Sequence, residues 1–514
     1  MDDPFTCQII NAAIDASAQE MFDVLRRTAM SPIIYEVLDV GTGITDPEGN
    51  LISSGAGIPS FIGVLDKSVS AILAKFEGNV FDGDVFITND PNYGGVTHLN
   101  DIVIAQPVFH DGQLIAWVAS IAHWGDIGGK TPGSMPVDVI DIFGEGLRLP
   151  LIKLMEKGAA NKSVMEIITT NSRLSDFVVG DMNAQLAASQ KASILIKAVA
   201  DRYGIKTFFH AISSALDEGF ERASTGLYQL PKGAFSISEP QDDGENLNAV
   251  ISITDEKFIV DLSDNPNQMN APHNTSRDGA IIACQMFFKA LTDPERFANA
   301  GSFKPLEVLT KPGTIFHAVG DVPHGYYFET RIRLFDMLWH CMAKHVPDRL
   351  PAGHFASIFG TVIAGQHPDT GKKYTMVEPQ MGGWGATSER DGMSAMYSTS
   401  HGDTFNCPVE IAEARYGLEV IEKSLAEKES SDGIFQGGCG VKTVYQLHGQ
   451  ANISVGISHA KIPVWSLNDA PVGGVNSLEI EHPNHVRDRY SFVSGLVLDK
   501  GSKIIIKTAN GGNC

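Results

Sequence analysis

Residues 101–123 have the sequence DIVIAQPVFHDGQLIAWVASIAH, in which two apolar segments flank the short polar stretch HDGQ. Apolar segments rich in valine and isoleucine that are joined by an Asp-Gly turn are typical of a β-hairpin. An antiparallel hairpin brings the outer ends of its two strands together. The sequence therefore predicts that the residues around Asp101 lie beside those around His123.

A histidine and an aspartate lie three positions apart at each of these outer ends. His98 and Asp101 follow a Gly-Gly pair in NDPNYGGVTHLNDI. His123 and Asp126 precede another Gly-Gly pair in AHWGDIGGK. Side chains three positions apart point to opposite faces of a strand, but they can face one point from a tight turn, which glycine permits. We therefore expect the two pairs to lie close together where the hairpin strands end.

This combination of side chains predicts a metal site. Two imidazoles with one or two carboxylates suit a divalent ion, and they leave a coordination position open for water or a substrate oxygen. We predict that His98, Asp101 and His123 are both the metal ligands and the catalytic residues, and we favour zinc or manganese. Asp39, at the end of the apolar segment EVLDV, is a further candidate ligand. The alternative is that the carboxylates cap turns and the histidines are hydrogen-bonded core residues.

Other polar residues are expected to support the site. Asp126 could accept a hydrogen bond from a ligating imidazole and so fix its tautomer. Asp90 and Asn89 could support the preceding loop in the same way. Candidates for substrate or interface contacts, each of which could equally be structural, are Glu145, Arg173 and Asn274.

Several other kinds of site are excluded by the sequence. The stretch GDIGGKT (residues 125–131) resembles a phosphate loop, but its first glycine is one residue too close. Pro132 and Pro136 also prevent the helix whose N-terminus would hold phosphate. No GxSxG motif is present, and the cysteines form no CxxC pair, so neither a serine nucleophile nor a cysteine-zinc site is expected.

Charge and composition limit the possible partners and location. The net charge of −22 opposes binding to nucleic acid or to an anionic membrane surface. No apolar run approaches the roughly 18–20 residues of a membrane span. The start MDDPFTC shows neither the basic nor the apolar part of a secretory signal. The widely spaced cysteines make a disulfide framework unlikely, so a reduced cytoplasm is predicted.

The pattern of apolar residues along the chain predicts a multi-layer α+β fold. Segments with strand-like and with helical periodicity alternate in blocks. The predicted regions are a β-rich N-terminal region with the metal site (1–150), a helical segment (151–230), a mixed region (231–420) and a β-rich C-terminal region (421–514).

These motifs together resemble the signature blocks of the hydantoinase B/oxoprolinase family. The similar blocks include NDPNYGGVTHLNDI, AHWGDIGGKTPGSMP, EGLRLPLIKL, SPIIYEVLD, NSRLSDFVVGDMNAQLAA, NCPVEIAEARYGLEVI and GGCGVKTVYQL. They extend from about residue 5 to the C-terminus and occur in the family's order. One departure is Trp124, which stands where the family usually has a second histidine.

The resemblance implies the metal-binding subunit of a two-part, ATP-dependent enzyme. Family members hydrolyse cyclic amides such as hydantoins, lactams and 5-oxoproline, while relatives in acetone and acetophenone carboxylases carboxylate ketones. The partner would be a hydantoinase A-like subunit that binds ATP, in a heterotetramer with two copies of each chain. The family's ligands correspond to His98, Asp101 and His123, with Asp39 as a further carboxylate. A ketone carboxylase subunit and a non-catalytic scaffold with a structural metal remain as alternatives.

Overall fold

The computed structural model describes residues 3–514 except 296, 403 and 429–432. The helices are α1 (Pro4–Thr28), α2 (Pro32–Tyr35), α3 (Pro59–Lys75), α4 (Lys162–Asn171), α5 (Ser175–Tyr203), α6 (Ile205–Tyr228), α7 (Arg277–Thr292), α8 (Tyr327–Ala343) and α9 (Val409–Arg415). Two 3-10 segments lie at Ile142–Gly144 and Ala300–Phe303. None of the helices in this part of the chain is long and apolar enough to cross a membrane.

The first sheet contains the expected hairpin at its centre. Its seven antiparallel strands have the order β2-β1-β5-β4-β3-β6-β7. Their bounds are β1 (Val40–Thr45), β2 (Leu51–Gly57), β3 (Val85–Thr88), β4 (Asp101–His110), β5 (Gln113–His123), β6 (Ile152–Glu156) and β7 (Ala159–Ala160). The turn between β4 and β5 has Asp111 and Gly112 at positive φ, as a two-residue hairpin turn requires. The predicted hairpin is confirmed, with Asp101 opposite His123.

Both faces of this sheet are buried, each against different helices. Along β4, Ile102 and Ile104 pack in a core with α1 and α5. Val103 and Ala105 point the other way and pack in a core with α3. Because side chains alternate between the faces of a strand, an uninterrupted apolar run indicates a strand covered on both sides. This explains why the two segments are apolar throughout.

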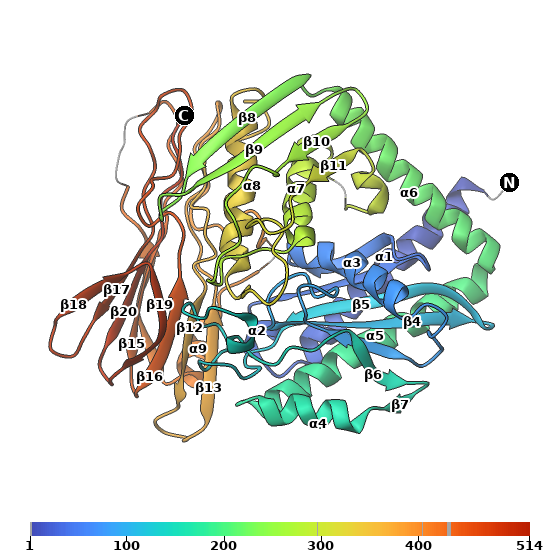
Figure 1. The fold of residues 1–514 in the computed structure, drawn as a ribbon, viewed down its shortest axis with the longest axis horizontal. Helices are drawn as coiled ribbons and strands as arrows, with labels where there is room; N and C mark the ends of the chain where they lie inside the picture. Colours follow the sequence, from blue (N-terminus) through green and yellow to red (C-terminus); the bar gives the residue numbers. More distant parts are fainter. Residues whose placement is uncertain (1–2, 296, 403, 429–432) are drawn as a thin grey trace.

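Three further sheets follow in the chain. The second has the order β11-β10-β9-β8, the third β13-β12-β16-β19 and the fourth β14-β15-β20-β17-β18. Their strands are β8 (Gly233–Pro240), β9 (Asn246–Ile253), β10 (Phe258–Asp261), β11 (Leu306–Leu309), β12 (Thr361–Gln366), β13 (Lys373–Glu378), β14 (Leu418–Leu425), β15 (Val441–Leu447), β16 (Ala451–Gly456), β17 (Ser477–Glu481), β18 (Arg487–Tyr490), β19 (Phe492–Leu498) and β20 (Lys503–Lys507). Figure 1 shows the last two sheets, in orange and red, gathered at one end of the molecule and the first sheet, in blue, toward the other.

Helix α8 is almost completely buried. Every residue of it except His340 is buried, and it packs against α7 and against strands β8 and β9 (Figure 1). A helix that is covered all round is normally apolar. This one nevertheless contains Glu329, Arg331, Arg333 and Asp336, so each charge has to be accounted for inside the protein.

The predicted α+β class with several sheets is confirmed. The helical segment is present as α4 to α6. The first sheet continues past residue 150 into β6 and β7. The third sheet draws strands from both sides of residue 420, and β14 of the fourth sheet spans that residue. The division into four regions stays a prediction.

Candidate metal centre

Strand pairing places Asp101 and His123 side by side. They are directly opposite each other at the ends of β4 and β5, and cross-strand partners point to the same face of a sheet. Both side chains lie on the face covered by α3, because Val103 and Ile121, two residues farther along each strand, pack there. The exposed fractions of Asp101 and His123 are 0% and 2%.

A tight loop brings His98 to the same point. Gly94 has a φ of +83°, which glycine adopts without strain. A Cβ on Gly95 would lie 2.4 Å from the backbone carbon of Asn89, so the loop folds back on itself only with glycine there. Asp101 N–H then donates to the His98 carbonyl at 3.2 Å, which turns the chain directly into β4. The role expected for the Gly-Gly pair is confirmed.

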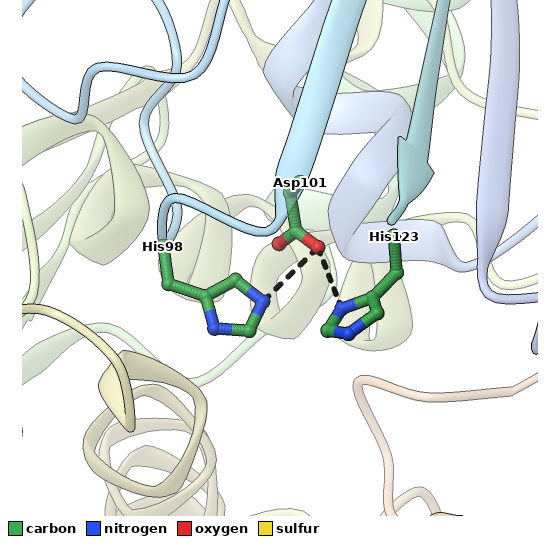
Figure 2. Close-up of side chains that lie close together, drawn as sticks. All are labelled: His98, Asp101 and His123. Carbon is green, nitrogen blue, oxygen red and sulfur yellow. Dashed lines mark hydrogen bonds and ion pairs between the residues drawn. The ribbon is translucent and has the colours of Figure 1, made fainter. Parts of the chain in front are cut away.

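The two imidazoles converge on one carboxylate oxygen, as Figure 2 shows. His98 Nε2 lies 3.1 Å and His123 Nδ1 lies 3.2 Å from Asp101 Oδ1. One potential ligand atom from each of the three residues lies within 4.8 Å of the other two. Two ligands that each lie about 2.1 Å from a metal ion are separated by roughly 3–4 Å. The spacing of these donors therefore fits a shared divalent ion.

The tautomer of His98 also suits a metal ligand. Its Nδ1 lies 3.0 Å from the carbonyl oxygen of Gly325, which can only accept, so Nδ1 carries the proton. This leaves the Nε2 lone pair facing the Asp101 carboxylate. A lone pair opposite an anion requires a cation between them, either a second proton on the ring or a metal ion.

The pKa shifts of His98 and Asp101 also indicate that a positive charge is needed between these two residues. Burial opposes a charge on His98, but Asp101 outweighs this effect and raises the pKa of His98 above its ordinary value. Burial also opposes the charge on Asp101, but the two imidazoles hold its pKa well below the usual range. The carboxylate is therefore ionised and attracts a positive charge.

Asp39 lies at the edge of this cluster, immediately before β1. Its Oδ2 is 3.9 Å from His123 Nδ1, and its Oδ1 is buried without a hydrogen-bond partner among the described residues. Burial raises the pKa of Asp39 to about 6, against the opposing effect of His123. An unsatisfied buried carboxylate oxygen beside two imidazoles fits the expected further ligand, and its role as a ligand stays a prediction.

Comparison with known proteins places the chain in a family. A family model described as hydantoinase B/oxoprolinase matches residues 3–514. The chain belongs to this family. The resemblance noted in the sequence is thereby confirmed. The B component of a putative D-/L-hydantoinase from a Pseudomonas species is 27% identical over 504 residues, which cover 93% of this chain and 84% of the relative.

Two solved structures share the fold. An ATP-dependent caprolactamase from Pseudomonas jessenii has a TM-score of 0.93 at 23% identity and covers 99% of this chain and 90% of its own. A nucleotide-free acetone carboxylase has a TM-score of 0.89 at 15% identity and covers 100% of this chain and 76% of its own. The fold of the hydantoinase B/oxoprolinase family is thus shared by an ATP-dependent caprolactamase and an acetone carboxylase.

The residue that departs from the usual hydantoinase B/oxoprolinase motif does not touch the candidate ligands. Trp124 is fully buried, and its indole N–H donates to Gln185 of α5 at 3.0 Å. It follows His123 directly and therefore points to the opposite side of the strand end, toward the core that contains α1 and α5. The substitution leaves the face with His98 and Asp101 unaltered.

Asp126 has different partners from the expected ones. Its carboxylate accepts hydrogen bonds from the N–H groups of Gly128, Gly133 and Arg173, and from the guanidinium of Arg173 at 3.0 Å. In the described part of the chain it accepts none from an imidazole. These contacts do not match the expectation that Asp126 fixes the tautomer of a ligand histidine. Instead, Asp126 and Arg173 stabilise the loop after β5.

We expect Asp126→Asn to destabilise the protein while leaving its metal content unchanged. The amide would lose the charged pairing with Arg173 and would present an NH₂ group to donors, at a cost of about 1–3 kcal/mol. Thermal unfolding and elemental analysis of the same preparation would check this. Loss of metal at unchanged stability would instead restore Asp126 to a ligand-positioning role.

The remaining predicted residues hold the loops around the site. Asp90 pairs with Arg148 at 2.6 Å, and the Asn89 side chain bonds to the backbone of Leu99 and Leu149. Among the described residues, the Asn274 side chain bonds to backbone groups, in the segments around residues 269–271 and at 323. Asp90 and Asn89 therefore support the loop, as expected. The contacts of Asn274 are structural and do not indicate a substrate contact.

Glu145 acts on His98 through the backbone. Its two carboxylate oxygens accept hydrogen bonds from the N–H groups of His324 and Gly325, and the carbonyl of Gly325 is the group that holds His98 Nδ1. Burial raises the pKa of Glu145 to about 7, despite these two hydrogen bonds. Glu145 is therefore a positioning residue for the loop that orients His98.

We expect Glu145 to make the folded state less stable as the pH rises from about 4.5, its ordinary pKa, to about 7. The folded state binds this proton more tightly than the unfolded state, so ionisation opposes folding across this window, by up to about 3 kcal/mol in total. The stability difference between wild type and Glu145→Gln should fall over this range and level off above it. Denaturant unfolding at several pH values would measure it, with the exposed Glu166→Gln as the matched control.

A small cavity of about 40 Å³ lies at the site. Its lining includes the four candidate ligands and, from distant segments, the polar residues Tyr327, Arg331 and His401. A larger, mostly apolar cavity of about 750 Å³ is lined by Pro59 and Ile62, which flank the Phe61 of the small cavity at the start of α3. The large cavity has the size of a typical small-molecule binding site, whereas the small cavity is lined by the candidate metal ligands.

The sequence did not reveal the residues that complete the small cavity. Tyr327 O–H donates to Asp101 Oδ2 at 3.2 Å and so fixes the second oxygen of the central carboxylate. Arg331 and His401 are also buried against the cavity. The signal that could have indicated one of them is the pair of arginines in RIRLFD, which stand inside an otherwise apolar helix.

Proposed function

We propose that this chain is the metal-binding subunit of an ATP-dependent cyclic-amide hydrolase. Its substrate would be a hydantoin or lactam whose ring a hydantoinase A-like partner activates by phosphorylation. The observation that carries the proposal is the convergence of His98, Asp101 and His123 on one buried point. The larger cavity lined by the start of α3 has room for a small ring. Family membership and the hydantoinase relative support the same reaction class.

The residues of this chain have distinct parts in the proposal. His98, Asp101 and His123 would hold a zinc or manganese ion, with Asp39 as a further ligand. A bound ion of this kind polarises a carbonyl group and lowers the pKa of a water molecule. Tyr327 and the Gly325 carbonyl keep the carboxylate and the first imidazole in place. The buried walls exclude bulk water, which strengthens every electrostatic interaction in the cavity.

Activation by ATP would take place in the partner. The glycine-rich stretch Gly125–Thr131 is a loop, and the next helical element is the short 3-10 segment at Ile142–Gly144. It therefore lacks the strand-to-helix geometry that holds phosphate. We propose a complex with a hydantoinase A-like ATP-binding subunit in the cytoplasm, as a heterotetramer with two copies of each chain.

A ketone carboxylase subunit is the second candidate. Its support is the fold shared with acetone carboxylase. The hydrolase is favoured because the hydantoinase relative matches this chain over most of both lengths. A scaffold with a purely structural metal fits less well, because structural zinc normally has four closed protein ligands and Asp39 lies at the edge of the other three.

Reconstitution with the partner subunit tests the proposed function. The complex would be incubated with ATP and, in separate reactions, with a hydantoin, lactams of five to seven ring atoms, and a ketone with bicarbonate. We expect ATP-dependent ring opening of at least one cyclic amide, and none with this chain alone. Ketone consumption that requires bicarbonate, without turnover of any cyclic amide, would contradict the proposal. Turnover by this chain alone would contradict the need for a partner.

A further inference from the structure

Arg331 is a buried charge without a matching anion. Its exposed fraction is 1%, and its Nε has no hydrogen-bond partner among the described residues. Its guanidinium lies over the ring of Tyr327, 4.9 Å from the centroid, and one terminal nitrogen lies 3.4 Å from the Tyr327 hydroxyl. Within the described parts of the chain no carboxylate lies at ion-pair distance from it. A guanidinium stays protonated even in such surroundings, so its charge is permanent.

Arg333, on the same helix, shows that another buried guanidinium in this protein is paired with carboxylates. Arg333 is also buried, but it lies 3.2 Å from a carboxylate oxygen of Glu239 and 3.1 Å from one of Asp336. An unpaired buried charge costs several kcal/mol, whereas a paired one is largely compensated. The contrast indicates that Arg331 is left unpaired for a ligand rather than for stability.

His401 presents a second unsatisfied group to the same cavity. Its exposed fraction is 6%, and its buried Nε2 has no hydrogen-bond partner in the described structure. It comes from the loop before α9, whereas Arg331 comes from α8, so two unrelated segments each bring a residue with an unpartnered nitrogen to the lining of one small cavity. Polar groups in such positions are normally satisfied by protein, water or a ligand.

The charges in the cavity favour an anion once a metal is present. Ionised Asp39 and Asp101 would balance a divalent ion, and neutral imidazoles add no charge. Among the described residues that line the cavity, Arg331 would then remain as an unmatched positive charge. The cavity of about 40 Å³ has room for a few water molecules or one small polyatomic group. It therefore fits a single charged group better than a whole ring.

We propose that Arg331 and His401 form an anion subsite next to the metal ligands. The subsite takes one oxyanion group, phosphoryl or carboxylate, because the guanidinium matches the paired oxygens of either group. His401 Nε2 provides a hydrogen-bonding contact from the other segment. This inference rests on the proposed function and deepens it, because it places the charged part of an activated or opened substrate beside the metal.

Titration of the full-length, Mn²⁺-loaded chain tests the subsite. Methylphosphonate and acetate would be titrated separately by calorimetry into wild type, Arg331→Met and Arg331→Lys, with Arg333→Lys as the matched control. We expect wild type to bind at least one anion, and Arg331→Met to weaken that binding by about 10- to 100-fold, the range for a hydrogen bond to a charged group. Arg333→Lys should leave it unchanged. The anion that binds more tightly identifies the group as phosphoryl or carboxylate.

Stability gives a second measurement that does not depend on activity. Without an added anion, Mn²⁺-loaded Arg331→Met should melt at the same temperature as wild type or higher, because it removes an unpaired buried charge. Addition of the anion should raise the melting temperature of wild type but not that of Arg331→Met. Absence of anion binding by wild type, or equal binding by Arg331→Met, would overturn the subsite even if cyclic amides are hydrolysed. Arg331-dependent binding without cyclic-amide turnover would uphold the subsite and reject the proposed function.

Discussion

Replacing Asp101 by asparagine is expected to lower turnover by the reconstituted complex by a factor of about a thousand or more. Asp101 is fully buried, and one of its oxygens lies within 3.2 Å of both imidazoles, so it is the centre of the candidate site. Asparagine keeps the volume but removes the negative charge that a divalent ion needs. The loss corresponds to several kcal/mol of transition-state stabilisation.

Initial rates with ATP and a cyclic amide would measure this effect, together with thermal unfolding of each variant. Asp84→Asn is the matched control, because Asp84 is another fully buried aspartate, immediately before β3 of the same sheet, and is paired with Lys153 at 2.9 Å. That control should lose stability while the folded fraction keeps its turnover. Retained turnover in Asp101→Asn, with only a lower melting temperature, would show that the metal is structural.

The double variant His98→Ala, His123→Ala is expected to lose nearly all bound metal, whereas wild type should carry near-stoichiometric zinc or manganese. Removing both imidazoles leaves only carboxylates, which bind these ions weakly in a buried site with few ligands. Elemental analysis of purified protein measures the content directly. His354→Ala is the matched control, because His354 is a buried histidine that lies 3.0 Å from Asp336 in a different cluster. Metal retained in the double variant, or absent from wild type, would contradict the site.

Much of the candidate site follows from the sequence because its parts are local. The hairpin is determined by two apolar runs and an Asp-Gly turn, and a hairpin leaves little freedom in where its strand ends lie. The loop that carries His98 depends on the positive φ of Gly94 and on Gly95, whose neighbours in space, Asn89 and Asp90, are also neighbours in the chain. Family membership likewise follows from motifs that are read along the chain.

The tertiary structure alone decided which distant residues complete the site. Tyr327 and Arg331 follow Asp101 by more than 220 positions, and they reach it because α8 is packed in the core. His401 arrives from another loop, and no local periodicity specifies that approach. The spacing of Asp126 predicts an imidazole partner, but in the structure its carboxylate bonds to Arg173 and to three backbone N–H groups.

The predictable part of the site depends on interactions between residues that are close in the chain, whereas the rest depends on packing between distant segments. Backbone conformation and strand pairing across a short turn are set by neighbouring residues, so sequence by itself determined the His98, Asp101 and His123 cluster. The partners of a buried charge are set by the packing of whole helices and sheets, and a sequence does not show which charges meet. That Arg333 is paired while Arg331 is left facing the ligands was therefore decided only by the tertiary structure.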